Sequence, residues 1–135
     1  MSTVQLKEFI KIQGISEATI QKYFQGLNAG DYQKTASLFT ENGVMHPPFE
    51  SEIVGRDAIF SYLNKEAIDI KAYPREGVSE TLSENLTQFQ VNGKVETSWF
   101  GINVSWLFTI NEKQQILDLK IKLLASRQEL LSLRR

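Results

Sequence analysis

The chain has 135 residues, of which 41% are hydrophobic and 23% charged, and these values are typical of one globular domain with a single core. Fifteen Lys and Arg side chains against sixteen Asp and Glu leave a formal net charge of −1, which excludes the strongly basic surface that nucleic-acid binding requires. The lack of cysteine excludes disulfides and a cysteine nucleophile, and a single histidine excludes a histidine-rich metal site.

Residues 1–14 are predicted to form an amphipathic N-terminal extension with Leu6, Phe9 and Ile10 on its apolar side. This segment lacks the apolar core of a signal peptide, and no run of about 18 apolar residues occurs along the chain. We therefore expect a cytoplasmic protein whose main domain spans residues 15–125.

Three amphipathic helices are predicted in the first half of the chain. Ser16 is expected to cap the first, and apolar residues at steps of three and four extend it through residue 28. Residues 28–31 are typical of a helix end followed by a new cap, so the second helix is predicted over 32–41 and the third over 55–70. A short strand at 44–46 ends at Pro47 and Pro48, which cannot lie in a central ladder.

After Pro74 the apolar period changes from about 3.6 residues to about 2. Residues 87–97 alternate like a strand with one wet face, 99–110 form a more apolar strand, and 115–124 alternate again after a hairpin-like break. A capping-box spacing at Ser126 predicts a short C-terminal helix over 126–135. Helices followed by strands predict an α+β fold, in which a strongly curved, mixed or antiparallel sheet wraps over three helices and forms a cone with an apolar interior.

Few residues are candidates for acid–base chemistry. His46 would need an orienting carboxylate, and a structural histidine at a strand end is the favoured interpretation. Asp118 interrupts an apolar alternating strand, and its face is left open. Two acidic pairs in polar, loop-like segments are expected to be solvated: Glu50 with Glu52, and Glu80 with Glu84.

Aromatic side chains with a polar tip are more promising. Tyr23 lies on the apolar stripe of the first predicted helix, and Trp99 and Trp106 lie in the most apolar strand segments. A buried Tyr O–H or Trp N–H needs a hydrogen-bond partner, which a backbone carbonyl or a ligand carbonyl would equally supply. Three such side chains aimed at one cavity would favour a ligand.

Ordered segments over most of the chain carry a resemblance to a known family. They comprise Tyr23 with residues 27–31, 47–51 leading to 53–55, 74–78, 93–95 leading to 99–101, 105–108, and 123–135. On these segments residues 15–135 resemble the C-terminal, NTF2-like domain of cyanobacterial orange carotenoid proteins, and more closely its stand-alone homologues.

The resemblance implies a ketocarotenoid of the echinenone or canthaxanthin type as the bound chromophore, and no metal. In the family a tyrosine of the first long helix and a tryptophan of a central strand donate hydrogen bonds to the ring keto oxygen, and these positions match Tyr23 and Trp106. A tryptophan that lines the tunnel matches Trp99. The remaining apolar pocket is expected from Leu27, Ile53, Val54, Ile70 and Val104.

The resemblance also implies partners and a role in photoprotection, including the quenching of singlet oxygen. Two copies are expected to share one pigment as a noncovalent homodimer, and the pigment would pass between a membrane, such as the thylakoid, and a helical carotenoid protein. Glu66 matches a carboxylate that contacts the helical N-terminal domain of the two-domain protein.

Two surface predictions accompany this interpretation. The dimer contact is expected on an open apolar sheet face that carries Phe89, Val91, Phe100 and Leu107. The tail with Leu130, Leu131 and Leu133 is expected to act as a lid over a tunnel mouth.

Two other hypotheses remain open at this point. One is an NTF2-like enzyme of the ketosteroid isomerase or polyketide cyclase type, acting on an apolar ketone, for which His46 or Asp118 would have to supply an acid or base at the pocket centre. The other is a dimerisation module with a cavity too small for a ligand.

Overall fold

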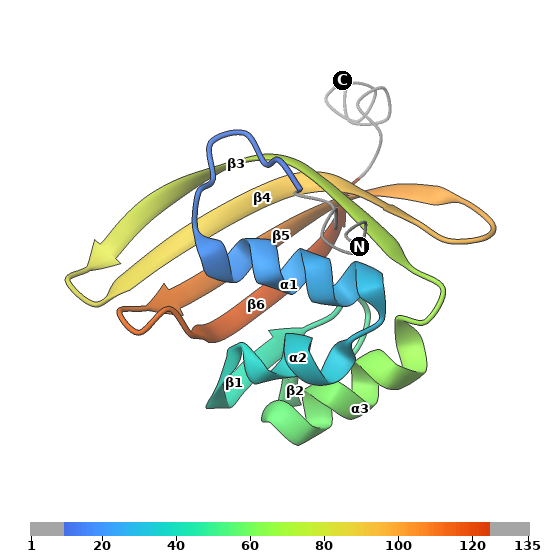
Figure 1. Ribbon diagram of the computed structural model, residues 1–135, viewed down its shortest axis with the longest axis horizontal. Helices are drawn as coiled ribbons and strands as arrows, with labels where there is room; N and C mark the ends of the chain where they lie inside the picture. Colours follow the sequence, from blue (N-terminus) through green and yellow to red (C-terminus); the bar gives the residue numbers. More distant parts are fainter. Residues whose placement is uncertain (1–9, 125–135) are drawn as a thin grey trace, which may run out of the picture.

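A computed structural model describes residues 10–124 as a curved sheet with helices on one side (Figure 1). The helices are α1 (Ala18–Ala29), α2 (Tyr32–Ser37) and α3 (Arg56–Glu66). The strands are β1 (Phe39–His46), β2 (Ile53–Val54), β3 (Lys71–Ser83), β4 (Leu86–Glu96), β5 (Gly101–Asn111) and β6 (Ile116–Leu124). The predicted arrangement of a curved sheet over three helices is confirmed for this part of the chain.

The six strands follow the order β2-β1-β6-β5-β4-β3. β1 and β6 pair in parallel and the other neighbours pair antiparallel, so the sheet is mixed. α1 crosses the long strands, whereas α2 and α3 lie beside β1 and β2 (Figure 1). The helices therefore cover only one face of the sheet, which we call the inner face.

The first helix begins and ends one residue later than predicted. Glu17 is the N-cap, because its carboxylate accepts a hydrogen bond from the Thr19 N–H at 3.2 Å, so the prediction of Ser16 was wrong. Gly30 ends the helix in the left-handed region at φ 78°, which glycine adopts without a Cβ clash. Asp31 then caps α2 by accepting from the Lys34 N–H at 3.1 Å.

The second helix is shorter than the helical spacing predicts. It ends at Ser37, and Phe39 begins β1. The Ile116 N–H donates to the Leu38 carbonyl at 2.9 Å, and Phe39 pairs with Ile116 while its ring is fully buried. Pairing with β6 therefore overrides a helical pattern that Phe39 would otherwise extend.

β3 is a strand that the sequence analysis does not predict. It pairs with β4 and is largely exposed, which explains why its sequence lacks an apolar pattern. Pro74 is tolerated because β3 lies at the sheet edge and its register shifts between Pro74 and Glu76. Glu80 lies on this strand, so its assignment to a loop was wrong.

The described part of the predicted extension packs against the domain. The Gln13 N–H donates to the Arg75 carbonyl at 2.9 Å, and the Gly77 N–H donates to the Gln13 carbonyl at 2.8 Å. Ile12 is buried within the core cluster. Residues 10–14 are therefore part of the packed structure. Leu6, Phe9 and the predicted tail helix, with Leu130, Leu131 and Leu133, lie outside the described residues.

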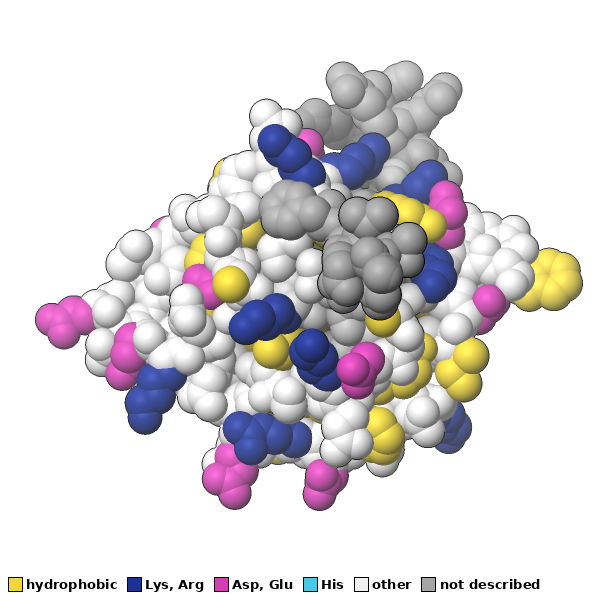
Figure 2. Space-filling view, in the orientation of Figure 1, with side chains coloured by type: hydrophobic (Ala, Val, Ile, Leu, Met, Phe, Trp, Pro, Cys, Tyr) yellow, Lys and Arg dark blue, Asp and Glu magenta, His cyan; other side chains and the backbone are white. Residues whose placement is uncertain are grey.

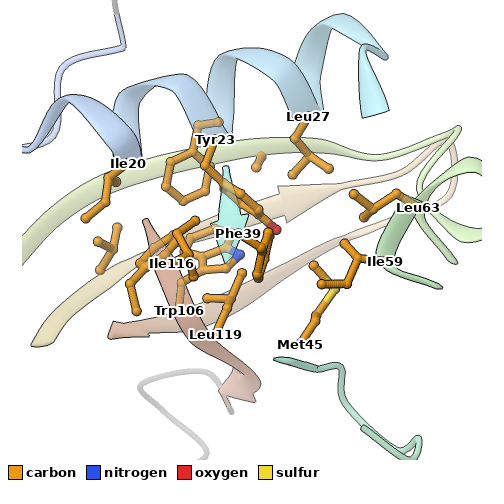
Figure 3. Close-up of a cluster of buried hydrophobic side chains, with 14 of the residues drawn as sticks. Ile20, Tyr23, Leu27, Phe39, Met45, Ile59, Leu63, Trp106, Ile116 and Leu119 are labelled. Carbon is orange, nitrogen blue, oxygen red and sulfur yellow. The ribbon is translucent and has the colours of Figure 1, made fainter. Parts of the chain in front are cut away.

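The core fills the space between the helices and the inner face of the sheet (Figure 3). Its centre is a set of edge-to-face aromatic contacts that join α1 to β5, including Phe24 with Trp106 at 4.8 Å and Tyr23 with Phe108 at 5.3 Å between ring centroids. Such pairs add about 0.5–1.5 kcal/mol beyond the area that they bury. These contacts hold α1 in a fixed position over the sheet.

The outer face of the sheet is polar, which contradicts the predicted open apolar face. Phe89 and Val91 are buried on the inner side, because they pair with Phe108 and Trp106 of β5. Their neighbours Gln90 and Asn92, of opposite parity, face outward. Only Leu107 of the four predicted residues lies on the outer face, since Phe100 precedes β5 and lines a cavity.

No helix among residues 10–124 is long and apolar enough to cross a bilayer. In the space-filling view, Lys and Arg side chains are interspersed with Asp and Glu over the visible face (Figure 2). Apolar side chains gather there toward the side on which α3 and the β4–β5 turn lie (Figures 1 and 2).

Candidate ligand cavity

A cavity of about 260 Å³ opens between α1, α3 and the inner face of the sheet. Its wall is almost entirely apolar and is contributed by two helices and by strands β1, β4, β5 and β6. The lining residues that carry the argument are Tyr23, Tyr62, Glu66, Phe100, Val104 and Trp106. Tyr23 and Trp106 are buried, whereas Glu66 and Phe100 are exposed, so the first pair lies at the base and the second at the mouth.

Tyr23 reaches the base of the cavity from the inward stripe of α1. The residue is 1% exposed, and its hydroxyl has no hydrogen-bond partner among residues 10–124. Burial raises the pKa of Tyr23 well above its usual value, and the nearby Tyr62 raises it further. The hydroxyl is therefore a neutral donor at any physiological pH.

Trp106 reaches the same cavity from the centre of β5. The residue is 2% exposed, and its indole N–H also has no hydrogen-bond partner within the described part of the chain. Figure 3 shows both side chains extending into the space between α1 and the sheet. The site therefore offers two neutral donors in apolar surroundings.

The predicted pocket residues divide into two groups. Leu27, Ile70 and Val104 line the cavity, as Glu66 does at its mouth. Ile53 and Val54 do not, because β2 lies at the edge of the sheet beyond β1, and Val54 is 54% exposed. Met45, which pairs with Ile53, lines the cavity instead.

Trp99 lies outside the cavity wall, in the turn before β5, and is 86% exposed. Its predicted place in a strand was wrong, because Thr97 Oγ1 accepts from the N–H groups of Trp99 and Phe100 and closes the turn. Ser98 donates to the Asp69 carboxylate through its N–H at 3.1 Å and its hydroxyl at 3.0 Å, which ties this turn to the loop after α3.

Tyr62 is a cavity residue that the sequence analysis missed. It lies one residue before the buried Leu63 of α3, three residues after the buried Ile59, and is half-buried in the cavity wall. Burial raises its pKa, and the negative charges of Glu50 and Glu66 raise it further. Its spacing of three residues from Ile59 was the signal that could have found it.

The structure brings His46 and Asp118 together, but on the wrong face for an enzyme site. His46 Nε2 lies 2.8 Å from Asp118 Oδ1, and both side chains are about one-third exposed. Their neighbours Met45 and Leu119 pair with each other and face the core, so His46 and Asp118 face outward. Among residues 10–124 no group of three His, Asp or Glu residues could hold a metal ion.

A family model described as a SnoaL-like domain matches residues 20–97. The chain is 38% identical to the orange carotenoid-binding protein of Limnospira maxima over 92% of its length and 40% of that protein. It is also 38% identical to the orange carotenoid-binding protein of Synechocystis sp., over 93% of its length and 41% of that protein. The chain thus spans about two fifths of the length of the curated relatives that it matches.

Solved structures agree with these sequence matches. The orange carotenoid protein of Anabaena (Nostoc) sp., solved with canthaxanthin, superposes with a TM-score of 0.87 at 37% identity, covering 97% of this chain and 43% of that one. The overlap confirms the predicted NTF2-like fold. More distant structures, which include ketosteroid isomerase-like and cyclase-like proteins at 15% and 19% identity, share the fold alone.

Proposed function

The chain belongs to the SnoaL-like domain family and is a homologue of the C-terminal domain of orange carotenoid proteins, and from this premise we propose that it binds a ketocarotenoid of the echinenone or canthaxanthin type by one terminal ring. The observation that carries the proposal is the pair of unpartnered donors, Tyr23 and Trp106, in one apolar cavity. Both would donate to the ring keto oxygen.

The chemistry of the cavity suits a ketone better than a charged ligand. A carbonyl oxygen has two lone pairs and accepts two neutral donors without burying a charge. Each hydrogen bond adds about 0.5–1.5 kcal/mol, and leaving either donor buried without a partner costs about 1–3 kcal/mol. The apolar lining from Leu27, Ile70 and Val104 would contact the hydrocarbon part of the ring.

The size of the cavity supports entry of one end of the pigment only. Its volume of about 260 Å³ is below the roughly 300–1,000 Å³ of pockets that enclose a whole drug-sized ligand. Most of a carotenoid polyene would therefore remain outside the mouth. A second protein surface or a membrane must cover it.

The mouth carries exposed apolar side chains that suit such a second surface. Ile68, Trp99 and Phe100 are exposed, and the hydrogen bonds between Ser98 and Asp69 hold their two loops together. Contiguous apolar side chains around a cavity mark interaction sites. In our proposal this rim meets a second copy in a noncovalent homodimer, or a helical carotenoid protein when the pigment is transferred.

Glu66 places an exposed carboxylate beside the mouth, where a basic side chain of the helical partner would meet it. Transient contact of the apolar rim with a thylakoid membrane would allow the pigment to enter or leave. Photoprotection, including quenching of singlet oxygen, would then follow from the bound pigment. The geometry of the cavity does not support the enzyme hypothesis, because neither His46 nor Asp118 lines the cavity.

A pigment titration tests the proposal. The purified chain is mixed with canthaxanthin, which carries ring keto groups, and with β-carotene, which carries none, and the visible spectrum and bound fraction are recorded. We expect saturable binding of canthaxanthin with a shifted absorption band, and weaker binding of β-carotene. Equal binding of both pigments, or of neither, would contradict the proposal.

A further inference from the structure

Tyr62 gives the cavity a third polar group that the two deep donors do not account for. Its side chain lines the cavity from α3, whereas Tyr23 lines it from α1 and Trp106 from β5. It is half-buried, and its hydroxyl has no hydrogen-bond partner among the described residues. A phenylalanine would fill the same space, so the hydroxyl has no evident packing role.

The hydroxyl of Tyr62 is neutral and electrostatically close to that of Tyr23. Burial, then Glu50 and Glu66, raise the pKa of Tyr62, so it retains its proton at neutral pH. Tyr62 also raises the pKa of Tyr23, and both residues line the same cavity. A neutral phenol both donates and accepts a hydrogen bond.

The other neutral hydroxyl in the cavity wall, that of Thr97, is already engaged, because it accepts from the N–H groups of Trp99 and Phe100 and donates to the Phe100 carbonyl. Leu27, Leu63 and Val104 are apolar, and the carboxylate of Glu66 is exposed at the mouth. A ring whose keto oxygen met Tyr23 and Trp106 would fix its neighbouring ring carbon within the cavity. A hydroxyl on that carbon would be buried without a partner unless Tyr62 supplied one.

We propose that Tyr62 is a specificity-determining residue that favours carotenoids whose keto ring also carries a hydroxyl group on the adjacent carbon. The inference rests on the proposed function, because it requires a keto ring in the cavity. It adds the ligand class: the deep donors select the keto group, and Tyr62 selects among ketocarotenoids. A site of this kind discriminates through the polar group that one ligand leaves unpaired.

The test compares two pigments that differ only in their ring hydroxyls, canthaxanthin and its dihydroxylated counterpart astaxanthin. Each is titrated against the wild type, Tyr62→Phe and Tyr73→Phe. Tyr73 is the matched control, since it is exposed on β3 and does not line the cavity. We expect the wild type and Tyr73→Phe to bind astaxanthin about three- to tenfold more tightly than canthaxanthin. Tyr62→Phe should lose this preference and keep its affinity for canthaxanthin.

Three results would overturn the inference. They are equal affinities for the two pigments in the wild type, a preference that survives in Tyr62→Phe, and a parallel loss of both affinities in that variant, which would mark a packing role. All three leave the proposed function intact, because canthaxanthin still binds the wild type. Failure of the wild type to bind either pigment would instead overturn the proposed function and this inference together.

Discussion

The inner and outer faces of the sheet use the same strands for different chemistry. Inward residues of β4 and β5 are large and apolar, and the polar tip of Trp106 is neutral. Outward residues carry the charged pairs, with His46 2.8 Å from Asp118 and Lys94 Nζ 3.1 Å from Glu96 Oε2. The ion pairs thus stay in contact with water, and the apolar inner face carries neutral donors.

This difference explains why the His46–Asp118 pair does not face the cavity. A proton-transferring group must reach the substrate, whereas His46 and Asp118 are separated from the cavity by the sheet. Tyr23 and Trp106 do reach the cavity, and neither side chain loses its proton near neutral pH. The arrangement suits binding and positioning of a carbonyl.

The largest expected effect comes from truncating neighbouring residues on opposite faces. Phe108→Ala removes a fully buried ring that contacts Tyr23 and Phe24, and should lower the free energy of unfolding by about 3–5 kcal/mol. Leu107→Ala, on the outer face, should cost about 1 kcal/mol or less. Denaturant unfolding of both variants measures the difference, and equal losses would contradict the assignment of the faces.

A smaller effect is expected from adding one methyl group to the sheet. A Cβ at Gly93 would lie 2.3 Å from the Tyr73 carbonyl oxygen, so Gly93→Ala must displace β3 and should cost about 1–3 kcal/mol. At Gly101 the nearest atom would be Lys94 Cδ at 3.5 Å, and Gly101→Ala should stay within about 0.5 kcal/mol of the wild type. Thermal unfolding compares the two variants. A Gly93→Ala variant as stable as the wild type would contradict the close approach of β3 to Gly93.

The rim around the mouth should affect exchange of the pigment without affecting stability. Trp99→Ser alters an exposed side chain outside the core, so the free energy of unfolding should change by about 0.5 kcal/mol or less. In our proposal the transfer of canthaxanthin from lipid vesicles to the variant should be several times slower than to the wild type. Stopped-flow absorbance measures the rate, with Val78→Ser, an exposed residue of β3, as the control. An unchanged transfer rate would exclude a role of this rim in pigment transfer.

The smallest effect is expected at the outer ion pair. His46→Asn breaks a contact in which both side chains are about one-third exposed, and screening by solvent limits its contribution to about 1 kcal/mol or less. Pigment affinity should not change, because His46 does not line the cavity. A large loss of pigment affinity in this variant would contradict the outward position of His46 and would support the enzyme hypothesis.

Local patterns predicted most helices and strands because their periods are read over many residues. α1 follows from its apolar stripe and from Gly30 and Asp31, and β4 and β6 follow from alternation. Phe39 was misassigned because its place is set by pairing with Ile116, which lies 77 residues away. β3 was missed because an exposed edge strand needs no apolar alternation.

The candidate site was predictable only in part. Periodicity alone places Tyr23 and Trp106 in a core, and their common cavity was expected only through the family resemblance. Tryptophan is common in strands, so the sequence favours a strand at Trp99. The turn that exposes Trp99 depends on the Thr97 hydroxyl and on the Ser98–Asp69 contact. Tyr62 was missed because it is only half-buried, and its spacing of three residues from Ile59 was not read as part of the inner stripe of α3.

The central claim, that Tyr23 and Trp106 donate to one ligand oxygen, is tested most directly by a double-mutant cycle. Wild type, Tyr23→Phe, Trp106→Phe and the double variant are titrated with canthaxanthin and with β-carotene, and unfolding without pigment is measured alongside. We predict that each single change weakens canthaxanthin binding by about two- to thirteenfold, with non-additive effects in the double variant. Affinity for β-carotene should stay nearly constant, and Tyr23→Phe, which removes a cavity-lining hydroxyl without a partner among residues 10–124, should not lose stability. Equal canthaxanthin affinity in all four proteins would contradict the claim and leave the family relationship as one of fold alone.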